Sequence, residues 1–149
     1  MNQREDSVST YFRLFNEIGI IAQLSGNKLE RVLPEGMSLA QFSVLNHFCR
    51  LGGAWSPTRL AAAFQVTKGA MTNTLQRLEA QRFVTIRADE EDTRAKIVEI
   101  TDAGRSAREA AIRATGPIIM ELAGLIPLAD VKAALPFLEF VRKTLDENR

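Results

Sequence analysis

The spacing of apolar residues changes in the middle of the chain and predicts four short elements there. Ser56–Phe64 opens with a serine cap and a proline, which are typical of a helix start, and Thr67–Gln81 begins with a threonine cap. Phe83–Arg87 and Lys96–Ile100 instead alternate and are rich in β-branched residues, as strands are. A polar segment joins the two strands. Two helices across a tight turn, followed by a hairpin, predict a winged helix-turn-helix.

A long helix is predicted on the N-terminal side of this segment. Tyr11–Leu33 carries apolar residues on two faces, a stripe wider than one core can cover, so the surplus could meet a second subunit. Pro34 breaks this helix. Ser38 and Gln41 then form a capping box, which opens a second helix that runs to about Leu51.

The residues after the hairpin are also predicted to be helical. Thr101 caps a helix in which Pro117 predicts a kink, because proline lacks a backbone donor and clashes with the preceding turn. Pro127 starts a last helix, which meets a second predicted kink at Pro136. Long helices therefore flank the winged segment on both sides.

The expected fold class is mainly α with a small β-hairpin wing. We expect a single domain over residues 1–149, with the winged helix-turn-helix at about residues 38–100. The flanking dimerisation helices are expected at about residues 8–34 and 101–147.

Charge is unevenly distributed, although the net charge of the 149-residue chain is only +1. Residues 56–88 carry five basic side chains against one acidic side chain, a local charge of +4. Residues 89–100 carry five acidic side chains against two basic ones, a local charge of −3. The basic excess lies on the helix pair, where a surface that binds nucleic-acid phosphates is expected.

No set of residues indicates catalysis, a metal site or a cofactor. The sequence has no grouped Ser/His/Asp set, no Cys–His pair and no phosphate-cradling glycine loop, so we do not expect an enzyme. His47, the only histidine, has too few ligands nearby for a metal site. Cys49, the only cysteine, is either a small buried hydrophobe or, in an exposed electropositive setting, a thiol sensor. Without a signal region or a run of about 18 apolar residues, we expect a cytoplasmic protein.

Several motifs resemble those of the MarR family of winged-helix regulators, and the resemblance covers nearly the whole chain. The most specific is Asp92–Gly104, which is similar to the family pattern of Asp-x-Arg, a strand, and Leu-Thr-x-x-Gly at a helix start. Ile100 stands where leucine is usual. Leu75–Val84 is similar to the end of the family's recognition helix and the entry to its wing, with Arg82 where glycine is common.

The resemblance implies a homodimer, made by the first and last helices, that binds a roughly palindromic double-stranded operator. It also implies release by a small, often phenolic or aromatic, effector bound between the dimerisation and DNA-binding parts. We therefore interpret the chain as a sequence-specific DNA-binding transcriptional regulator and a repressor. The alternative is a winged-helix protein-interaction module without DNA binding, which the acidic hairpin favours and the basic helix pair disfavours.

Short polar residues on one face of Thr67–Gln81 are predicted to contact DNA, because hydroxyl and amide groups can hydrogen-bond base edges in the major groove. The N-terminus of the preceding helix is a favourable binding site for a phosphate group. The predicted DNA-binding residues are Ser56, Thr58, Thr67, Lys68, Gly69, Thr72, Asn73, Gln76, Arg77, Asp92 and Arg94. The alternative is a solvated helix face, and Arg77 could instead pair with Glu79 or with an acidic residue of the hairpin.

Arg94 occupies the arginine of the Asp-x-Arg motif, just past the hairpin tip. We expect it to enter the minor groove, held by a charge-assisted hydrogen bond that it donates to Asp92. The alternative is a surface ion pair of little consequence. The acidic run Asp89–Asp92 should repel phosphate and weaken the contact of the wing with DNA.

An effector pocket is predicted from Phe12, His47 and Trp55. The alternative for His47 is a packed or interface histidine without a role in ligand binding. The expected partners are therefore double-stranded operator DNA, a second copy of the chain and a small aromatic effector, with no membrane and no cofactor.

Overall fold

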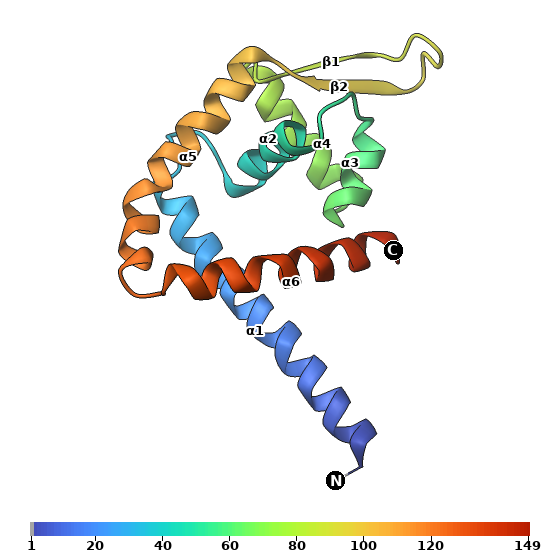
Figure 1. Ribbon diagram of the computed structural model, residues 1–149. Coiled ribbons are helices and arrows are strands. Elements are labelled where there is room, and N and C mark those ends of the chain that lie inside the picture. Colours follow the sequence, from blue (N-terminus) through green and yellow to red (C-terminus); the bar gives the residue numbers. More distant parts are fainter. Residues whose placement is uncertain (1) are drawn as a thin grey trace. The chain divides into compact units, whose positions relative to one another are not determined.

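The computed structural model describes residues 2–149, which form six helices and one two-stranded antiparallel sheet (Figure 1). The predicted order of elements and the winged-helix fold class are confirmed. The elements are α1 (Gln3–Val32), α2 (Leu39–Leu51), α3 (Pro57–Phe64), α4 (Lys68–Ala80), β1 (Val84–Ala88), β2 (Lys96–Ile100), α5 (Asp102–Ala123) and α6 (Leu128–Glu147). α1 begins earlier than expected, because the polar segment before Tyr11 is also helical.

Side-chain caps fix where the helices of the winged part begin. Ser38 Oγ accepts a hydrogen bond from the Gln41 backbone N–H at 3.1 Å, and Gln41 Oε1 accepts one from the Ser38 N–H at 2.8 Å. Ser56 caps α3 by accepting from the Arg59 N–H at 3.1 Å, and Thr67 caps α4 in the same way. The predicted capping box and both caps are confirmed, and each cap contributes about 1 kcal/mol.

The winged part encloses one hydrophobic core, to which α2, α3, α4 and both strands contribute. Its largest fully buried side chains are Phe48, Leu45, Leu60, Leu75, Leu78, Val44, Val84 and Val98. From α4, Met71, Leu75 and Leu78 are buried, as their helical spacing predicted. Because one face of α4 is buried along its length, the opposite face must point toward solvent.

A third extended segment anchors the hairpin. β1 and β2 pair from Val84 opposite Ile100 to Ala88 opposite Lys96. On the other edge of β2, the Trp55 N–H donates to the Val98 oxygen at 3.0 Å, and the Val98 N–H donates to the Trp55 oxygen at 2.8 Å. The segment between α2 and α3 is thereby tied to the root of the wing.

Neither internal proline ends its helix. Pro117 lies inside α5 and Pro136 lies inside α6, and both helices continue past the residue that lacks a donor. Pro127 occupies the cap position of α6, so the predicted start of the last helix is confirmed within one residue.

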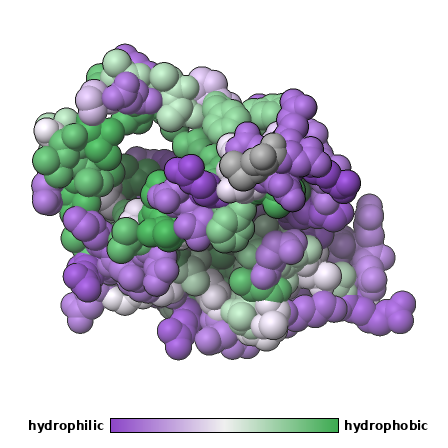
Figure 2. Space-filling model, turned by 90° about the horizontal axis from the view of Figure 1, so that it is seen from below, coloured by the Kyte–Doolittle hydropathy of each residue, from purple (hydrophilic) through white to green (hydrophobic). Residues whose placement is uncertain are grey.

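The chain divides into two compact units, one ending at Ala114 and the other formed by Thr115–Arg149, with the boundary inside α5. α1 in the first unit and α6 in the second have no buried residues. Tyr11 and Phe12 of α1 are 65% and 68% exposed, and Phe140 of α6 is 65% exposed. Broad apolar areas, green in Figure 2, lie at the surface. Exposed apolar surface of this extent marks an interaction site.

Candidate nucleic-acid interface

The exposed face of α4 collects polar residues that the sequence singled out. These residues are Lys68, Gly69, Thr72, Asn73, Gln76 and Arg77, and all are exposed. Within residues 2–149, no ion pair engages Arg77, so neither Glu79 nor an acidic residue of the wing holds its guanidinium. The face thus presents two cations together with amide and hydroxyl groups, which are suited to hydrogen-bond base edges and phosphates.

Two of the predicted hydroxyl contacts also serve as helix caps. Ser56 Oγ accepts the Arg59 N–H, and Thr67 Oγ1 accepts the Ala70 N–H, both at 3.1 Å. Each hydroxyl keeps its own O–H donor, which a phosphate oxygen can accept. Thr58 is exposed on the first turn of α3, where the helix dipole favours an anion.

The wing tip is held by its own carboxylates. Asp92 Oδ1 accepts a hydrogen bond from the Arg94 backbone N–H at 3.0 Å, and Arg94 Nε lies 3.6 Å from the same oxygen. Asp89 Oδ1 accepts the Glu91 N–H at 3.0 Å. The expected pairing of Asp92 with Arg94 is present, but its hydrogen bond is donated by the backbone. The Arg94 side chain is 93% exposed and points into solvent.

The basic side chains of the winged part differ in whether they interact with a carboxylate, with an aromatic ring or with neither. Arg87 on β1 lies 3.6 Å from Glu99 on β2, so part of its charge is offset within the wing. The Arg59 guanidinium carbon lies 4.3 Å from the centre of the Trp55 ring. The sequence indicates Arg59 only as one of the five basic residues of the segment 56–88, because Trp55 lies before α3 and no motif links it to Arg59. Among residues 2–149, no carboxylate forms an ion pair with Arg59 on α3 or with Lys68 and Arg77 on α4, and all three are exposed.

Two of the three predicted effector-pocket residues lie together. The ring centre of His47 is 4.4 Å from that of Trp55 and 5.2 Å from that of Phe64. His47 is 6% exposed, and Trp55 Nε1 donates to the Gly52 oxygen at 2.9 Å. Phe12 lies on α1, where it lines a shallow hollow with other residues of that helix. The sequence did not indicate Phe64, which joins the cluster only through tertiary packing.

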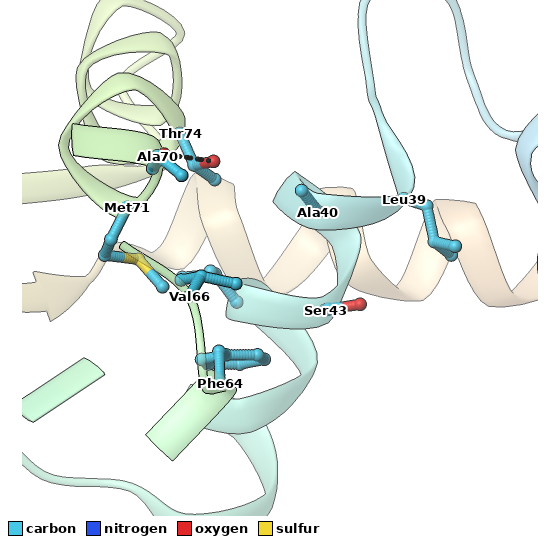
Figure 3. A pocket seen from close by; sticks show the side chains of 9 residues that line it. Leu39, Ala40, Ser43, Phe64, Val66, Ala70, Met71 and Thr74 are labelled. Carbon is cyan, nitrogen blue, oxygen red and sulfur yellow. Dashed lines mark hydrogen bonds between the residues drawn. The ribbon is translucent and has the colours of Figure 1, made fainter. Parts of the chain in front are cut away.

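An apolar cavity of about 320 Å³ lies between α2, α3 and α4 (Figure 3). Its lining consists of Leu39, Ala40, Ser43, Val44, Phe64, Val66, Ala70, Met71 and Thr74. Thr74 Oγ1 donates to the Ala70 oxygen at 3.1 Å, so this hydroxyl is already satisfied within α4. Phe64 belongs both to the cavity and to the ring cluster around His47. No motif in the sequence indicates the cavity, because its lining residues come from separate elements.

Metal and membrane sites are not supported by the described residues. Within residues 2–149, no group of three or more His, Cys, Asp or Glu side chains could hold a metal ion. Over the same residues, no helix is both long enough and apolar enough to cross a bilayer. Cys49 is half-buried on α2.

Comparison with known proteins supports the assignment made from the motifs. Residues 35–95 match the model of the MarR family. The transcriptional regulator BldR from Sulfolobus solfataricus is 26% identical, with 99% of each chain covered and a TM-score of 0.74. Wild-type MarR from E. coli in its apo form is also 26% identical, with 86% of this chain and 95% of that chain covered and a TM-score of 0.74. Comparison with curated proteins returned no match.

A mutant of E. coli MarR in complex with operator DNA is similar as well. It is 25% identical, covers 89% of this chain and 95% of its own, and has a TM-score of 0.69. The family model spans α2 to the wing tip, and the solved structures extend the match to the flanking helices. The motifs, the winged helix and these matches agree: residues 35–95 match the model of the MarR family, and most of the chain is similar to solved transcriptional regulators that include MarR itself.

Proposed function

We propose that the protein is a sequence-specific repressor that binds operator DNA as a homodimer. The observation that carries the proposal is the exposed polar and basic face of α4, whose direction is fixed by burial of the opposite face. The operator complex of the similar E. coli MarR supports it. The N-terminal half of α4, with Lys68, Thr72 and Asn73, enters the major groove, and Arg94 reaches the adjacent minor groove.

Substitutions on α4 test this proposal. Asn73→Ala should reduce the preference for operator over random duplex by about 1–3 kcal/mol, because a good base contact carries that much discrimination. Lys68→Ala should weaken both complexes equally, because phosphate contacts position the protein without reading sequence. Anisotropy titrations would use a duplex from upstream of the protein's own gene and a shuffled duplex, with Arg105→Ala on α5 as the control. An unchanged preference in Asn73→Ala would refute base reading by this residue.

The dimer is proposed to form through the apolar faces of α1 and α6. Water exposure of such side chains costs about 25 cal/mol per Å², so covering them with a second copy is strongly favoured. Light scattering at micromolar concentration should give twice the chain mass of 16.5 kDa. Phe12→Glu and Phe140→Glu should shift the protein toward monomer, since each places a charge among apolar side chains. A monomeric parent chain would rule this assembly out.

Release of the operator is proposed to follow binding of a small aromatic effector. The ring cluster of His47, Trp55 and Phe64 and the adjoining apolar cavity support this, because both offer apolar surface beside α3 and α4. Trp55 is the only tryptophan, so its emission should change when such a ligand binds. The effector proposal fails if a panel of small phenols changes neither this emission nor the affinity for DNA.

A protein-interaction module without DNA binding is the second candidate. The exposed acidic residues at the wing tip favour it, because they repel phosphate. The two candidates differ in a single measurement, since the interaction module should not bind duplex DNA even at low salt.

A further inference from the structure

Arg59 is an exposed cation whose place is set by an aromatic ring. Its guanidinium carbon lies 4.3 Å from the centre of the Trp55 ring, within the range of a cation–π interaction. No ion pair engages Arg59 among residues 2–149. An exposed arginine side chain loses conformational entropy when it binds a ligand. Because the Trp55 ring already restricts the Arg59 side chain, less entropy is lost on binding.

Trp55 is itself held from three directions. Its Nε1 donates to the Gly52 oxygen at 2.9 Å, its backbone pairs with Val98 on β2, and its ring packs 4.4 Å from that of the buried His47. These contacts make Trp55 a fixed platform between α2, α3 and the wing. The Arg59 guanidinium is therefore held at a defined position on α3 without a carboxylate to neutralise it.

We infer that Arg59 binds a DNA phosphate and that Trp55 positions its guanidinium for this contact, an inference that rests on the proposed DNA-binding function. Arg59 lies on the first turn of α3, three residues after the Ser56 cap, where the helix dipole adds to its positive charge. A guanidinium that stacks on a ring still has N–H groups that point away from the ring. These groups can donate hydrogen bonds to phosphate oxygens. Trp55 acts through Arg59 and does not itself contact DNA.

Salt titrations distinguish a phosphate contact from a merely structural stack. Arg59→Ala should weaken binding to an upstream-gene duplex and to a shuffled duplex by the same factor. The slope of log affinity against log salt should fall by about 0.9 for each Arg59 that is lost. Arg59→Lys should restore most of the slope, because it keeps the charge. Arg105→Ala removes an exposed arginine from the first turn of α5, which directly follows β2, and should leave the slope unchanged.

A double-mutant cycle tests the positioning role. Trp55→Phe, which keeps a smaller ring in the same place, should weaken DNA binding by about two- to five-fold. The same substitution should have no effect on DNA affinity in the Arg59→Ala background, because its effect passes through Arg59. Urea unfolding of each variant identifies any that no longer fold, and Trp55→Tyr then takes the place of Trp55→Phe.

Trp55 emission gives a readout that does not depend on affinity. As the only tryptophan, it should change its emission when a phosphate engages Arg59, and this change should disappear in Arg59→Ala at saturating DNA. If Arg59→Ala keeps the parent affinity and slope while Lys68→Ala loses both, the inference is overturned and the proposed function stands. If the parent binds neither duplex at any salt concentration, the proposed function fails and the inference fails with it.

Discussion

Raising the salt concentration from about 50 to 200 mM should weaken binding of the protein to duplex DNA by about 10³. Each lysine or arginine that neutralises a phosphate releases counterions, so affinity falls steeply as salt rises. A dimer with about 6–10 phosphate contacts loses about 10³–10⁵ over this range. We expect the lower end because Glu90, Glu91 and Asp92 are exposed at the wing tip and oppose the basic helix pair.

The charges that produce this dependence lie on α3 and α4. Lys68 and Arg77 are exposed without a carboxylate partner among the described residues, whereas Arg87 is offset by Glu99 at 3.6 Å. The exposed wing acids repel any phosphate that approaches the wing, and salt screens this repulsion beyond about 10 Å at 0.1 M. Affinity measured by anisotropy at several salt concentrations gives the slope directly.

The double variant Glu90→Gln and Glu91→Gln is the matched test of the wing charge. It removes two carboxylates without changing side-chain size, and it should strengthen binding to every duplex at low salt. The gain should shrink at high salt, where these charges are screened. A parent affinity that does not change with salt would exclude a phosphate-binding surface on this protein.

The parts of the interface that depend on local sequence were predictable. Apolar residues at helical spacing placed Met71 and Leu75 in the core, and this alone fixed which face of α4 is exposed. The caps at Ser56 and Thr67 set the starts of both helices, because a cap is a bond between residues three apart. The alternation of β-branched residues likewise predicted both strands of the wing to within one residue.

Contacts between residues that are far apart in the sequence could not be predicted in this way. The bridge between Trp55 and Val98 involves a single residue on one side, so it has no period in the sequence. The apolar cavity is formed by residues of α2, α3 and α4 that no motif connects. The start of α1 was missed for another reason, since its first residues are polar and the helix there shows no apolar stripe.

Arg82 shows how a departure from a family pattern can be accommodated. It stands where glycine is common, and its φ of 62° lies in the left-handed region that disfavours side chains. Two hydrogen bonds hold it there: its N–H donates to the Glu79 oxygen at 2.8 Å, and Thr101 Oγ1 donates to its carbonyl oxygen at 2.7 Å. The sequence shows the departure at Arg82 and the bond to Glu79 is local, but the bond from Thr101 comes from the tertiary structure.

Gly104 is the point at which α5 meets the wing, and Gly104→Ala should destabilise the protein by about 3 kcal/mol. A Cβ at this position would lie 2.1 Å from the Phe83 carbonyl oxygen and 2.8 Å from Ile100 Cγ1. The carbonyl cannot move aside easily, because it accepts the Thr101 N–H at 3.0 Å. Relief of the clash would also disturb the α5 cap, in which Thr101 Oγ1 accepts the Gly104 N–H at 3.0 Å.

Gly116→Ala provides the matched control, because Gly116 lies in the same helix and a Cβ there would meet no atom within 4 Å. It should raise stability by about 0.5–1 kcal/mol, since alanine loses less backbone entropy than glycine in a helix. Urea unfolding of both variants at one protein concentration measures the difference, because the stability of an oligomer depends on concentration. If Gly104→Ala and Gly116→Ala unfold at the same urea concentration, the close contact between Gly104 and the Phe83 carbonyl does not contribute to stability. The expected loss at Gly104 alone would instead explain why the Thr-x-x-Gly motif requires glycine, because only a residue without a Cβ lets the helix start against the strand.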